Sequence, residues 1–313
     1  MSKPEIILVE PMMPAIEARL DADYLVHRLF DPAGREAALA ARPRIRAVVT
    51  GGGSGIGSDW IEAMPDLGIV AINGVGTDRV DLGLARSRGV DVTTTPGTLT
   101  DDVADMGMAL MLAVLRRIVE GDGFVRAGRW AAGEKFPLGA SLRGRRLGIL
   151  GLGQIGQALA RRAAAFGMVV SYWDRIAIPG IDLPRIADPA ALATASDVLA
   201  ICVAATPETR GLVDGDLLAA LGPQGIVVNI ARGSVVNEPD LIAALRGGGI
   251  AAAGLDVFES EPGIREEFLS LPNVVVTPHQ ASATVETRIA MGEAVLANLA
   301  AHFAGARPPA LVN

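Results

Sequence analysis

Three charged side chains of complementary chemistry stand just beyond three successive apolar segments in the last third of the chain. Arg232 comes after the run 225–230, Glu261 after 251–256, and His279 after 274–277. In a doubly wound parallel sheet, residues past the carboxyl ends of neighbouring strands meet in one crevice, where such sheets bind their ligands. The spacing therefore predicts a guanidinium, a carboxylate and an imidazole at one site.

These three groups suit the reduction of a 2-keto acid. Arg232 can hold the carboxylate and keto oxygens of a substrate in its fork of donors. A histidine side chain titrates at ~6.5 when unperturbed, so His279 alone is mostly neutral at pH 7. A carboxylate from Glu261 against its other ring nitrogen favours the charged, proton-donating form.

Other polar residues near these strand ends have more than one reading. Asp256 either binds the carboxamide of a nicotinamide or caps the turn after its strand, and we favour the first role. Glu259 is expected to be a solvated loop charge rather than a rival to Glu261. His27 and His302 have no such neighbours and are expected at the surface or the edge of the core.

A glycine motif, Gly151-Leu-Gly153-Gln-Ile-Gly156, follows the apolar segment 146–150 and opens a helix over 157–166. In that context the first glycine allows the turn, the second lets a pyrophosphate approach the backbone, and the third lets helix pack on strand. About twenty residues on, Asp174 can accept hydrogen bonds from an adenosine ribose and repel a 2′-phosphate, which favours NAD. Arg175 beside it can instead grip that phosphate, so NADP stays open.

The elements around these motifs form two alternating series, which is typical of parallel sheets covered by helices on both faces. We expect the α/β class with two doubly wound, Rossmann-like domains. The first series has strands at 5–9, 46–50 and 68–72 and a helix at 14–22; a long helix over 103–121 follows, and the second series has strands at 146–150, 168–173, 198–203, 225–230, 251–256 and 274–277 before a last helix at 285–303.

Composition excludes several other classes of protein. The net charge is -7, and the densest basic run, Arg143-Gly-Arg145-Arg146, is too short for a nucleic-acid or anionic-membrane surface. The single cysteine, Cys202, lies in an apolar run, so we expect a buried structural thiol, no disulfide and no metal site. The beginning of the chain shows no signal-peptide pattern and 106–115 is too short to span a bilayer, which predicts a cytoplasmic protein.

On the segments 151–156, 229–233, 256–262 and 277–282, the chain resembles the D-isomer-specific 2-hydroxyacid dehydrogenases over nearly its whole length. The resemblance implies catalysis by Arg232, Glu261 and His279. It implies a discontinuous substrate-binding, flavodoxin-like domain (1–97 and 286–313), a dinucleotide-binding domain (98–285), and a homodimer formed through the long helix and the arm around Trp130.

The run 95–105 looks like the glyoxylate/hydroxypyruvate and hydroxyphenylpyruvate reductase branch, many members of which prefer NADPH. Those members commonly have a small polar residue where this chain has Asp174. The resemblance also implies that backbone N–H groups of the loop 73–76 hold the substrate carboxylate; the loop 51–54 either lines the same pocket or is a plain turn.

The expected function is therefore NAD- or NADP-dependent reduction of a small 2-keto acid of the glyoxylate/hydroxypyruvate type to the D-2-hydroxy acid. The expected cofactor contacts are Gly151, Gly153, Gln154, Ile155, Gly156, Asp174, Arg175, Ile230 and Asp256, and the substrate contacts are Val75, Gly76, Arg232 and His279. The alternatives are a cofactor-sensing corepressor without turnover, a formate-dehydrogenase-like activity and a phosphoglycerate dehydrogenase. Glu261 disfavours the formate reaction, because the resemblance implies glutamine at this position in enzymes that oxidise formate.

Overall fold

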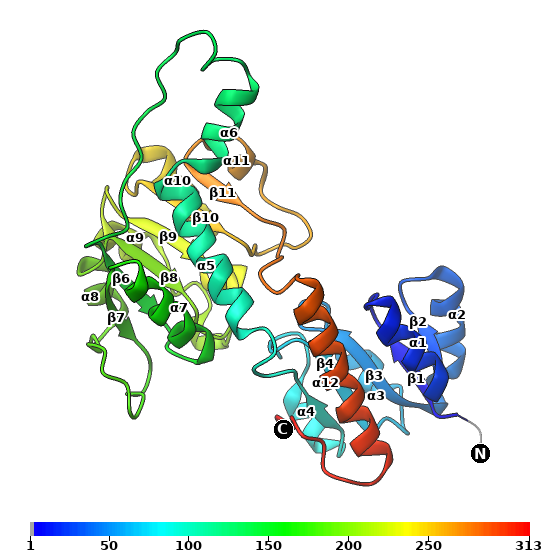
Figure 1. Cartoon of the computed structure of the whole chain (residues 1–313). Helices are drawn as coiled ribbons and strands as arrows, with labels where there is room; N and C mark the ends of the chain where they lie inside the picture. Colours follow the sequence, from blue (N-terminus) through cyan, green and yellow to red (C-terminus); the bar gives the residue numbers. More distant parts are fainter. Residues whose placement is uncertain (1–2) are drawn as a thin grey trace. The chain divides into compact units, whose positions relative to one another are not determined.

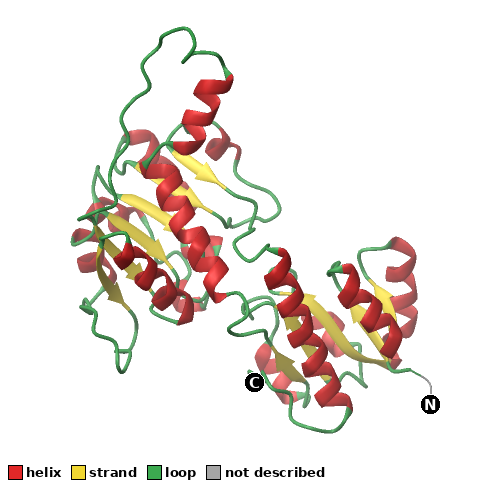
Figure 2. Ribbon diagram, viewed as in Figure 1, coloured by secondary structure: helices red, strands yellow, loops and turns green. Residues whose placement is uncertain are grey.

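The computed structural model describes residues 3–313 and divides the chain into two compact units. The first unit runs to Leu99 and includes Ala283–Asn313, and the second unit is Thr100–Ser282. Both belong to the α/β class, with parallel strands (yellow in Figure 2) flanked by helices.

The first unit has a five-stranded sheet in the order β2-β1-β3-β4-β5, with every pair parallel. Its strands are β1 (Glu5–Leu8), β2 (Leu25–Arg28), β3 (Ile45–Gly51), β4 (Ile69–Asn73) and β5 (Asp91–Thr93). Its helices are α1 (Pro14–Asp23), α2 (Pro32–Ala41), α3 (Ser58–Glu62), α4 (Leu82–Ser87) and α12 (Val285–Phe303).

Both faces of this sheet are covered by helices, which explains why the middle residues of its central strands are apolar and buried. On one face Ile6 and Leu8 pack with Ile16 of α1 and Val295 of α12. The opposite face, with Ile7, packs against α2, α3 and α4. The last helix of the chain thus covers one face of the first sheet, as Figure 1 shows for α12 in orange-red beside β4.

The second unit has six parallel strands in the order β11-β10-β9-β8-β6-β7. They are β6 (Arg146–Leu150), β7 (Val169–Trp173), β8 (Val198–Ile201), β9 (Ile226–Asn229), β10 (Ala252–Leu255) and β11 (Val274–Val276). From β6 the chain goes to β7 on one side and then to β8 on the other, so the direction of winding reverses between β6 and β8. That switch point is where doubly wound sheets bind dinucleotides.

Helices cover both faces of the second sheet. One face carries α5 (Thr100–Leu115) packed on α7 (Gln154–Ala165), and the other carries α8 (Pro189–Thr194), α9 (Gly215–Leu221) and α10 (Glu238–Gly247). Two further helices are α6 (Ile118–Arg126) and α11 (Glu266–Leu269). The two doubly wound sheets expected from the sequence are thereby confirmed.

The single long helix expected over 103–121 is wrong, because it is two helices. The chain turns at Arg117, which has a left-handed backbone with φ of 53°, and α6 then begins. The carbonyl oxygen of Leu115 accepts a hydrogen bond from Ala140 N–H at 2.7 Å, and Gly139 packs against the same oxygen. The returning loop therefore takes the acceptor that a continuing helix needs.

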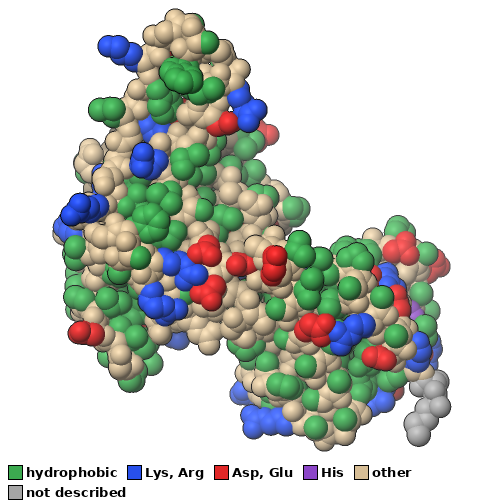
Figure 3. Space-filling view, viewed as in Figure 1, with side chains coloured by type: hydrophobic (Ala, Val, Ile, Leu, Met, Phe, Trp, Pro, Cys, Tyr) green, Lys and Arg blue, Asp and Glu red, His purple; other side chains and the backbone are tan. Residues whose placement is uncertain are grey.

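Charged side chains of both signs are interspersed on the face shown in Figure 3, without one broad field of either sign. Among residues 3–313, no helix has the length and apolar character needed to cross a membrane.

Candidate active site

The three strands that precede Arg232, Glu261 and His279 are neighbours in the second sheet. Leu255 of β10 pairs with Asn229 of β9 on one side and with Val276 of β11 on the other. The segments that follow therefore leave the sheet at the same level and on the same edge, as their sequence pattern predicts.

His279 and Glu261 form the centre of the site. The distance between His279 Nδ1 and Glu261 Oε2 is 2.6 Å, and Glu261 Oε1 accepts a hydrogen bond from Phe258 N–H at 2.8 Å. Burial raises the pKa of Glu261, but the bonds from His279 and Phe258 and the charge of Arg232 outweigh it, so this pKa lies below its usual value. Glu261 is therefore an anion at neutral pH, and Nε2 is the ring nitrogen of His279 left to face a substrate.

The backbone at His279 is left-handed, with φ of 48°, a conformation that a non-glycine residue keeps only when its surroundings enforce it. Asp256 provides that enforcement. Its backbone oxygen accepts a bond from His279 N–H at 2.8 Å, and its fully buried carboxylate accepts the Thr277 hydroxyl at 2.6 Å. The same carboxylate accepts the N–H groups of Gln280 and Ala281, each at 2.9 Å.

These contacts cap the turn after the neighbouring strand β11, not the turn after its own strand β10 that the sequence analysis had considered for Asp256. A contact of Asp256 with a nicotinamide stays a prediction.

Arg232 lies in the turn directly after β9, and Asn229 at the end of that strand braces the turn. The Asn229 side chain donates to Arg232 O and accepts from Ala231 N–H, both at 3.0 Å, while Arg232 Nη1 donates to Ala231 O at 2.8 Å. The charge of Arg232 contributes to the low pKa of Glu261, so the guanidinium acts on the same carboxylate as His279. The structure thus brings the three predicted residues together.

The glycine turn between β6 and α7 has the shape that a dinucleotide needs. Gly151 has φ of 92°, and a Cβ on Gly156 would lie 2.2 Å from Gly151 O, so neither position accepts a side chain. A Cβ on Gly153 would meet nothing within 4 Å, which leaves space over the turn. No side chain caps α7, so its first N–H groups remain available to a pyrophosphate. These residues fit NAD or NADP.

The residues after β7 bear on the choice between the two cofactors. Asp174 Oδ2 accepts a hydrogen bond from Leu152 N–H in the glycine turn at 2.9 Å, which places this carboxylate beside the dinucleotide position. Arg175 is exposed. The pKa of Glu208 is lowered mainly by the hydrogen bond from the Thr206 side chain, then by a backbone hydrogen bond and, least, by the charge of Arg175. The arginine therefore lies in the field of a nearby carboxylate.

The remaining predicted substrate contacts, Val75 and Gly76, belong to the first unit. They lie in the loop after β4, at the carboxyl edge of that sheet. A Cβ on Gly74 would lie 3.2 Å from Gly52 N, so this loop abuts the loop after β3. In that neighbouring loop the Ser54 hydroxyl donates to the carboxylate of Glu10.

The side chains expected to be inert have structural contacts. His27 pairs with Glu5 and His302 with Asp91, each at 2.9 Å. Although Cys202 is only partly buried as a residue, burial of its thiol raises the pKa to about 12, so the thiol stays protonated and is no nucleophile. Within residues 3–313 no group of three His, Cys, Asp or Glu is arranged to hold a metal ion.

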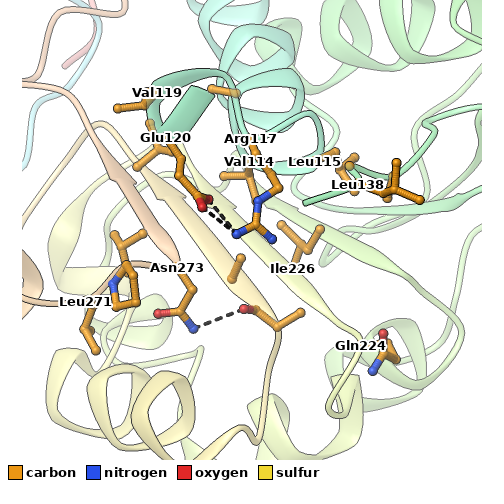
Figure 4. A pocket seen from close by; sticks show the side chains of 18 of the residues that line it. Val114, Leu115, Arg117, Val119, Glu120, Leu138, Gln224, Ile226, Leu271 and Asn273 are labelled. Atoms are coloured by element: carbon orange, nitrogen blue, oxygen red, sulfur yellow. Dashed lines mark hydrogen bonds and ion pairs between the residues drawn. The ribbon is translucent and has the colours of Figure 1, made fainter. Parts of the chain in front are cut away.

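A cavity of about 600 Å³ lies at the opposite edge of the second sheet (Figure 4). Ile226 and Ala252, the first residues of β9 and β10, line it together with Leu115, Arg117 and Leu138. Because ligands of doubly wound sheets bind at the carboxyl ends of the strands, this cavity is separate from the catalytic groups.

The sequence analysis missed one residue near the catalytic groups: Glu238, the first residue of α10, which contacts the segment that carries Glu261. Its buried carboxylate contacts Glu259 N–H and Arg265. No local pattern identifies it, because the partners that allow this glutamate to be buried come from a segment more than twenty residues further along the chain.

A glycine turn at the switch point of one parallel sheet, with a proton donor and an arginine at the adjoining strand ends, defines a dinucleotide-dependent dehydrogenase. Comparison with known proteins gives the family. Residues 108–281 match the model described as "D-isomer specific 2-hydroxyacid dehydrogenase, NAD binding domain".

Two curated relatives match over 96% of both chains: a 2-ketogluconate reductase of Gluconobacter oxydans, 48% identical, and a hydroxyphenylpyruvate reductase of Plectranthus scutellarioides, 44% identical. A crystal structure of an NADPH-dependent glyoxylate/hydroxypyruvate reductase from Sinorhizobium meliloti, in complex with NADP and malonate, is 40% identical. It aligns over 99% of this chain and 97% of its own with a TM-score of 0.94.

The chain belongs to the D-isomer-specific 2-hydroxyacid dehydrogenase family. It is an oxidoreductase that acts on 2-hydroxy acids with NAD or NADP.

Proposed function

We propose that this protein reduces a small 2-keto acid to the D-2-hydroxy acid, with Arg232 binding the substrate, His279 donating the proton and Glu261 holding His279 in its protonated form. The observation that carries the proposal is the 2.6 Å contact between His279 and a Glu261 carboxylate that the charge of Arg232 also reaches. When bound, a reduced nicotinamide supplies the hydride that adds to the keto carbon.

The chain's own groups do the rest. Arg232 donates to the carboxylate and keto oxygens, which fixes the orientation of the carbonyl and stabilises the negative charge that develops on its oxygen. His279 Nε2 transfers its proton to that oxygen, so the ketone becomes an alcohol and the ring becomes neutral. Glu261 stabilises the imidazolium before transfer and orients the ring through Nδ1.

For the substrate, we propose that backbone N–H groups of Val75 and Gly76 bind the carboxylate. The relatives are named for substrates with different tails: glyoxylate or hydroxypyruvate, 2-ketogluconate, and hydroxyphenylpyruvate. Glu10, bonded to Ser54 in the loop that abuts Gly74, makes this edge of the first sheet polar. A charged edge favours a short or hydroxylated tail over an aromatic one.

A substrate panel tests this directly. The enzyme is assayed with glyoxylate, hydroxypyruvate, 2-ketogluconate and phenylpyruvate as substrates, once with NADH and once with NADPH. The values of kcat/KM are then compared. We expect the highest values for the short and hydroxylated acids. A higher kcat/KM for phenylpyruvate than for all three others would contradict the proposed substrate class.

For the cofactor, we propose a preference for NADH over NADPH. Asp174 follows β7 beside the glycine turn, and Glu208, in the turn after β8, lies close enough to Arg175 for the charge of that arginine to lower its pKa. Their charges oppose a 2′-phosphate, while Asp174 can accept both ribose hydroxyls. The panel above gives the ratio of the two cofactors, and a higher kcat/KM with NADPH would contradict this assignment.

We further propose a homodimer formed by α5, α6 and the loop 127–140. This arm of the second unit, seen in green around α6 in Figure 1, exposes Trp130 (69%) and Leu138 (95%) together with Ile118, Val119 and Val125. Such an apolar surface beside an open cavity is typical of an interface between subunits. Sedimentation measures the mass: we expect a dimer that Leu138→Asp weakens, and a monomeric wild type would contradict the proposal.

A corepressor-like role without turnover is not favoured, because all three groups of the catalytic set are present: His279 contacts Glu261, and the charge of Arg232 lowers the pKa of the same carboxylate. A location in the cytoplasm stays a prediction from the sequence.

A further inference from the structure

The segment that carries Glu261 has no regular secondary structure. It runs from Asp256, after β10, to Arg265, before α11. Yet the Glu261 carboxylate must stay within hydrogen-bond reach of His279, because a catalytic group that moves by about 1 Å loses much of its effect. An irregular segment holds a side chain with that accuracy only if its backbone is anchored elsewhere.

Glu238 is that anchor. Its side chain is 4% exposed, and its two oxygens have different partners. Oε1 accepts a hydrogen bond from Glu259 N–H at 2.7 Å, and Oε2 accepts one from Arg265 Nε at 3.0 Å. One carboxylate therefore grips the segment two residues before Glu261 and again four residues after it.

The peptide bond between Phe258 and Glu259, whose N–H Glu238 binds, also contacts the turn that carries Arg232. Gly233 packs directly on it, since a Cβ at Gly233 would lie 1.9 Å from the carbonyl carbon of Phe258. Five residues after Gly233, Glu238 begins α10, whose start is capped by Asn237. Glu238 thus ties the turn that carries Arg232 to the segment that carries Glu261.

We propose that Glu238, neutralised by Arg265, is a positioning residue that keeps the Glu261 carboxylate in register with His279 and Arg232. The inference rests on the proposed role of Glu261 in keeping His279 protonated. Glu238 is not itself catalytic, because its oxygens are used by Glu259 and Arg265. It differs from a general structural anchor in one respect: a variant that lacks Glu238 but still folds has its Glu261 carboxylate displaced from His279.

The test compares Glu238→Ala and Glu238→Gln with the wild type. Alanine removes both contacts, whereas glutamine keeps an acceptor for Glu259 N–H and loses only the ion pair. We expect kcat/KM for glyoxylate in the alkaline range to fall by up to about tenfold in the alanine variant, no further than in Glu261→Gln, and by less in the glutamine variant. The alkaline limb of the pH profile moves to lower pH, because a displaced Glu261 no longer stabilises the imidazolium. Cofactor affinity, measured by fluorescence titration, stays unchanged.

Two controls separate positioning from a merely structural effect. Glu259→Gln removes the exposed carboxylate that pairs with Arg265 Nη2 at 3.4 Å, but it keeps the backbone N–H and the Arg265 Nε that Glu238 binds, so its pH profile stays that of the wild type. In a Glu261→Gln background, the further substitution Glu238→Ala costs little additional activity, because the carboxylate that Glu238 positions is already gone. An undiminished loss in that background would overturn the proposal, as would an unshifted pH profile in folded Glu238→Ala.

A readout independent of turnover completes the design. The chain has three histidines, so their ring-proton signals are assignable by nuclear magnetic resonance and can be titrated. We expect His279 to lose its proton at lower pH in Glu238→Ala than in the wild type, and identical titrations would overturn the proposal. If the wild type reduced no 2-keto acid, the proposed function would fail while this titration still decided the role of Glu238. Should Glu238→Ala not fold, Glu238→Gln and Arg265→Gln each remove only the ion pair and should shift the His279 titration to lower pH by a smaller amount; unshifted titrations in both would overturn the proposal.

Discussion

Replacing Glu261 by glutamine keeps the shape of the side chain and removes its charge, which isolates what the carboxylate does for His279. A hydrogen bond to a charged group stabilises by about 1.5–3 kcal/mol. The His279 and Glu261 side chains are 34% and 27% exposed, so water screens the pair and the lower end applies. About 1.4 kcal/mol corresponds to one pH unit.

The sign of the effect follows from the chemistry of reduction. The protonated ring is the active form, and the carboxylate stabilises it, so wild-type activity is present at low pH and lost as pH rises. Without the carboxylate that loss begins about one pH unit lower. The ratio of wild-type to variant kcat/KM therefore rises from about one in the acidic range to about ten in the alkaline range.

The assay is the initial rate of loss of reduced-nicotinamide absorbance with glyoxylate, measured across the pH range for the wild type, Glu261→Gln and Glu259→Gln. The last variant carries the same charge change on the same segment, at a side chain that does not contact His279, and should match the wild type. Coincident alkaline limbs for wild type and Glu261→Gln would refute the reasoning.

Three other outcomes are expected. Asp174→Ser should shift the preference toward NADPH about tenfold or more, because one carboxylate near a 2′-phosphate opposes it by roughly 1–3 kcal/mol; an unchanged NADH to NADPH ratio of kcat/KM would count against the role of Asp174. Gly156→Ala should lower both the free energy of unfolding, by about 1–3 kcal/mol, and cofactor affinity, since its Cβ would lie 2.2 Å from Gly151 O, whereas Gly153→Ala should lower cofactor affinity alone; equal unfolding midpoints for the two variants would contradict this. Because the pKa of Glu261 is lowered below its usual 4.5, its contribution to stability is present above that pH and lost as pH falls through the lowered value, so Glu261→Gln should lose less stability on acidification than the wild type, as chemical denaturation at several pH values would show.

The strands that the sequence predicted well are those buried on both faces. The central strands β4 and β9 begin with four and three apolar residues in a row, and β3 contains the run 47–49 after the exposed Arg46, because helices cover both sides of the sheet. The edge strand β2 was not predicted, since Leu25–Arg28 is partly exposed and mixes apolar with charged residues. The strand β5 has only three residues, too few to show a pattern.

Where tertiary contacts decide a boundary, local pattern failed. The apolar periodicity continues past Leu115, and the sequence around Arg117 contains no glycine or proline that would end a helix there. The helix ends there because Ala140, more than twenty residues away, donates its N–H to Leu115 O. Similarly, the expected start of the helix after the glycine motif was three residues late, because α7 begins inside the motif at Gln154.

The same distinction applies to the site. Arg232, Glu261 and His279 could be predicted because topology alone brings the ends of neighbouring strands together. Glu238 could not, because its function depends on how an irregular segment folds back over the start of α10. The contacts of Asp256 likewise depend on the backbone turn at His279, which its sequence does not reveal.

The central claim is that His279 is the proton donor in the reduction of a 2-keto acid. The most direct measurement combines turnover of glyoxylate with fluorescence titration of the cofactor for the wild type and His279→Ala. We predict a wild type that turns over and a variant that binds the cofactor with the same affinity but shows no measurable reduction. A His279→Ala variant that reduces glyoxylate at the wild-type rate would contradict the account.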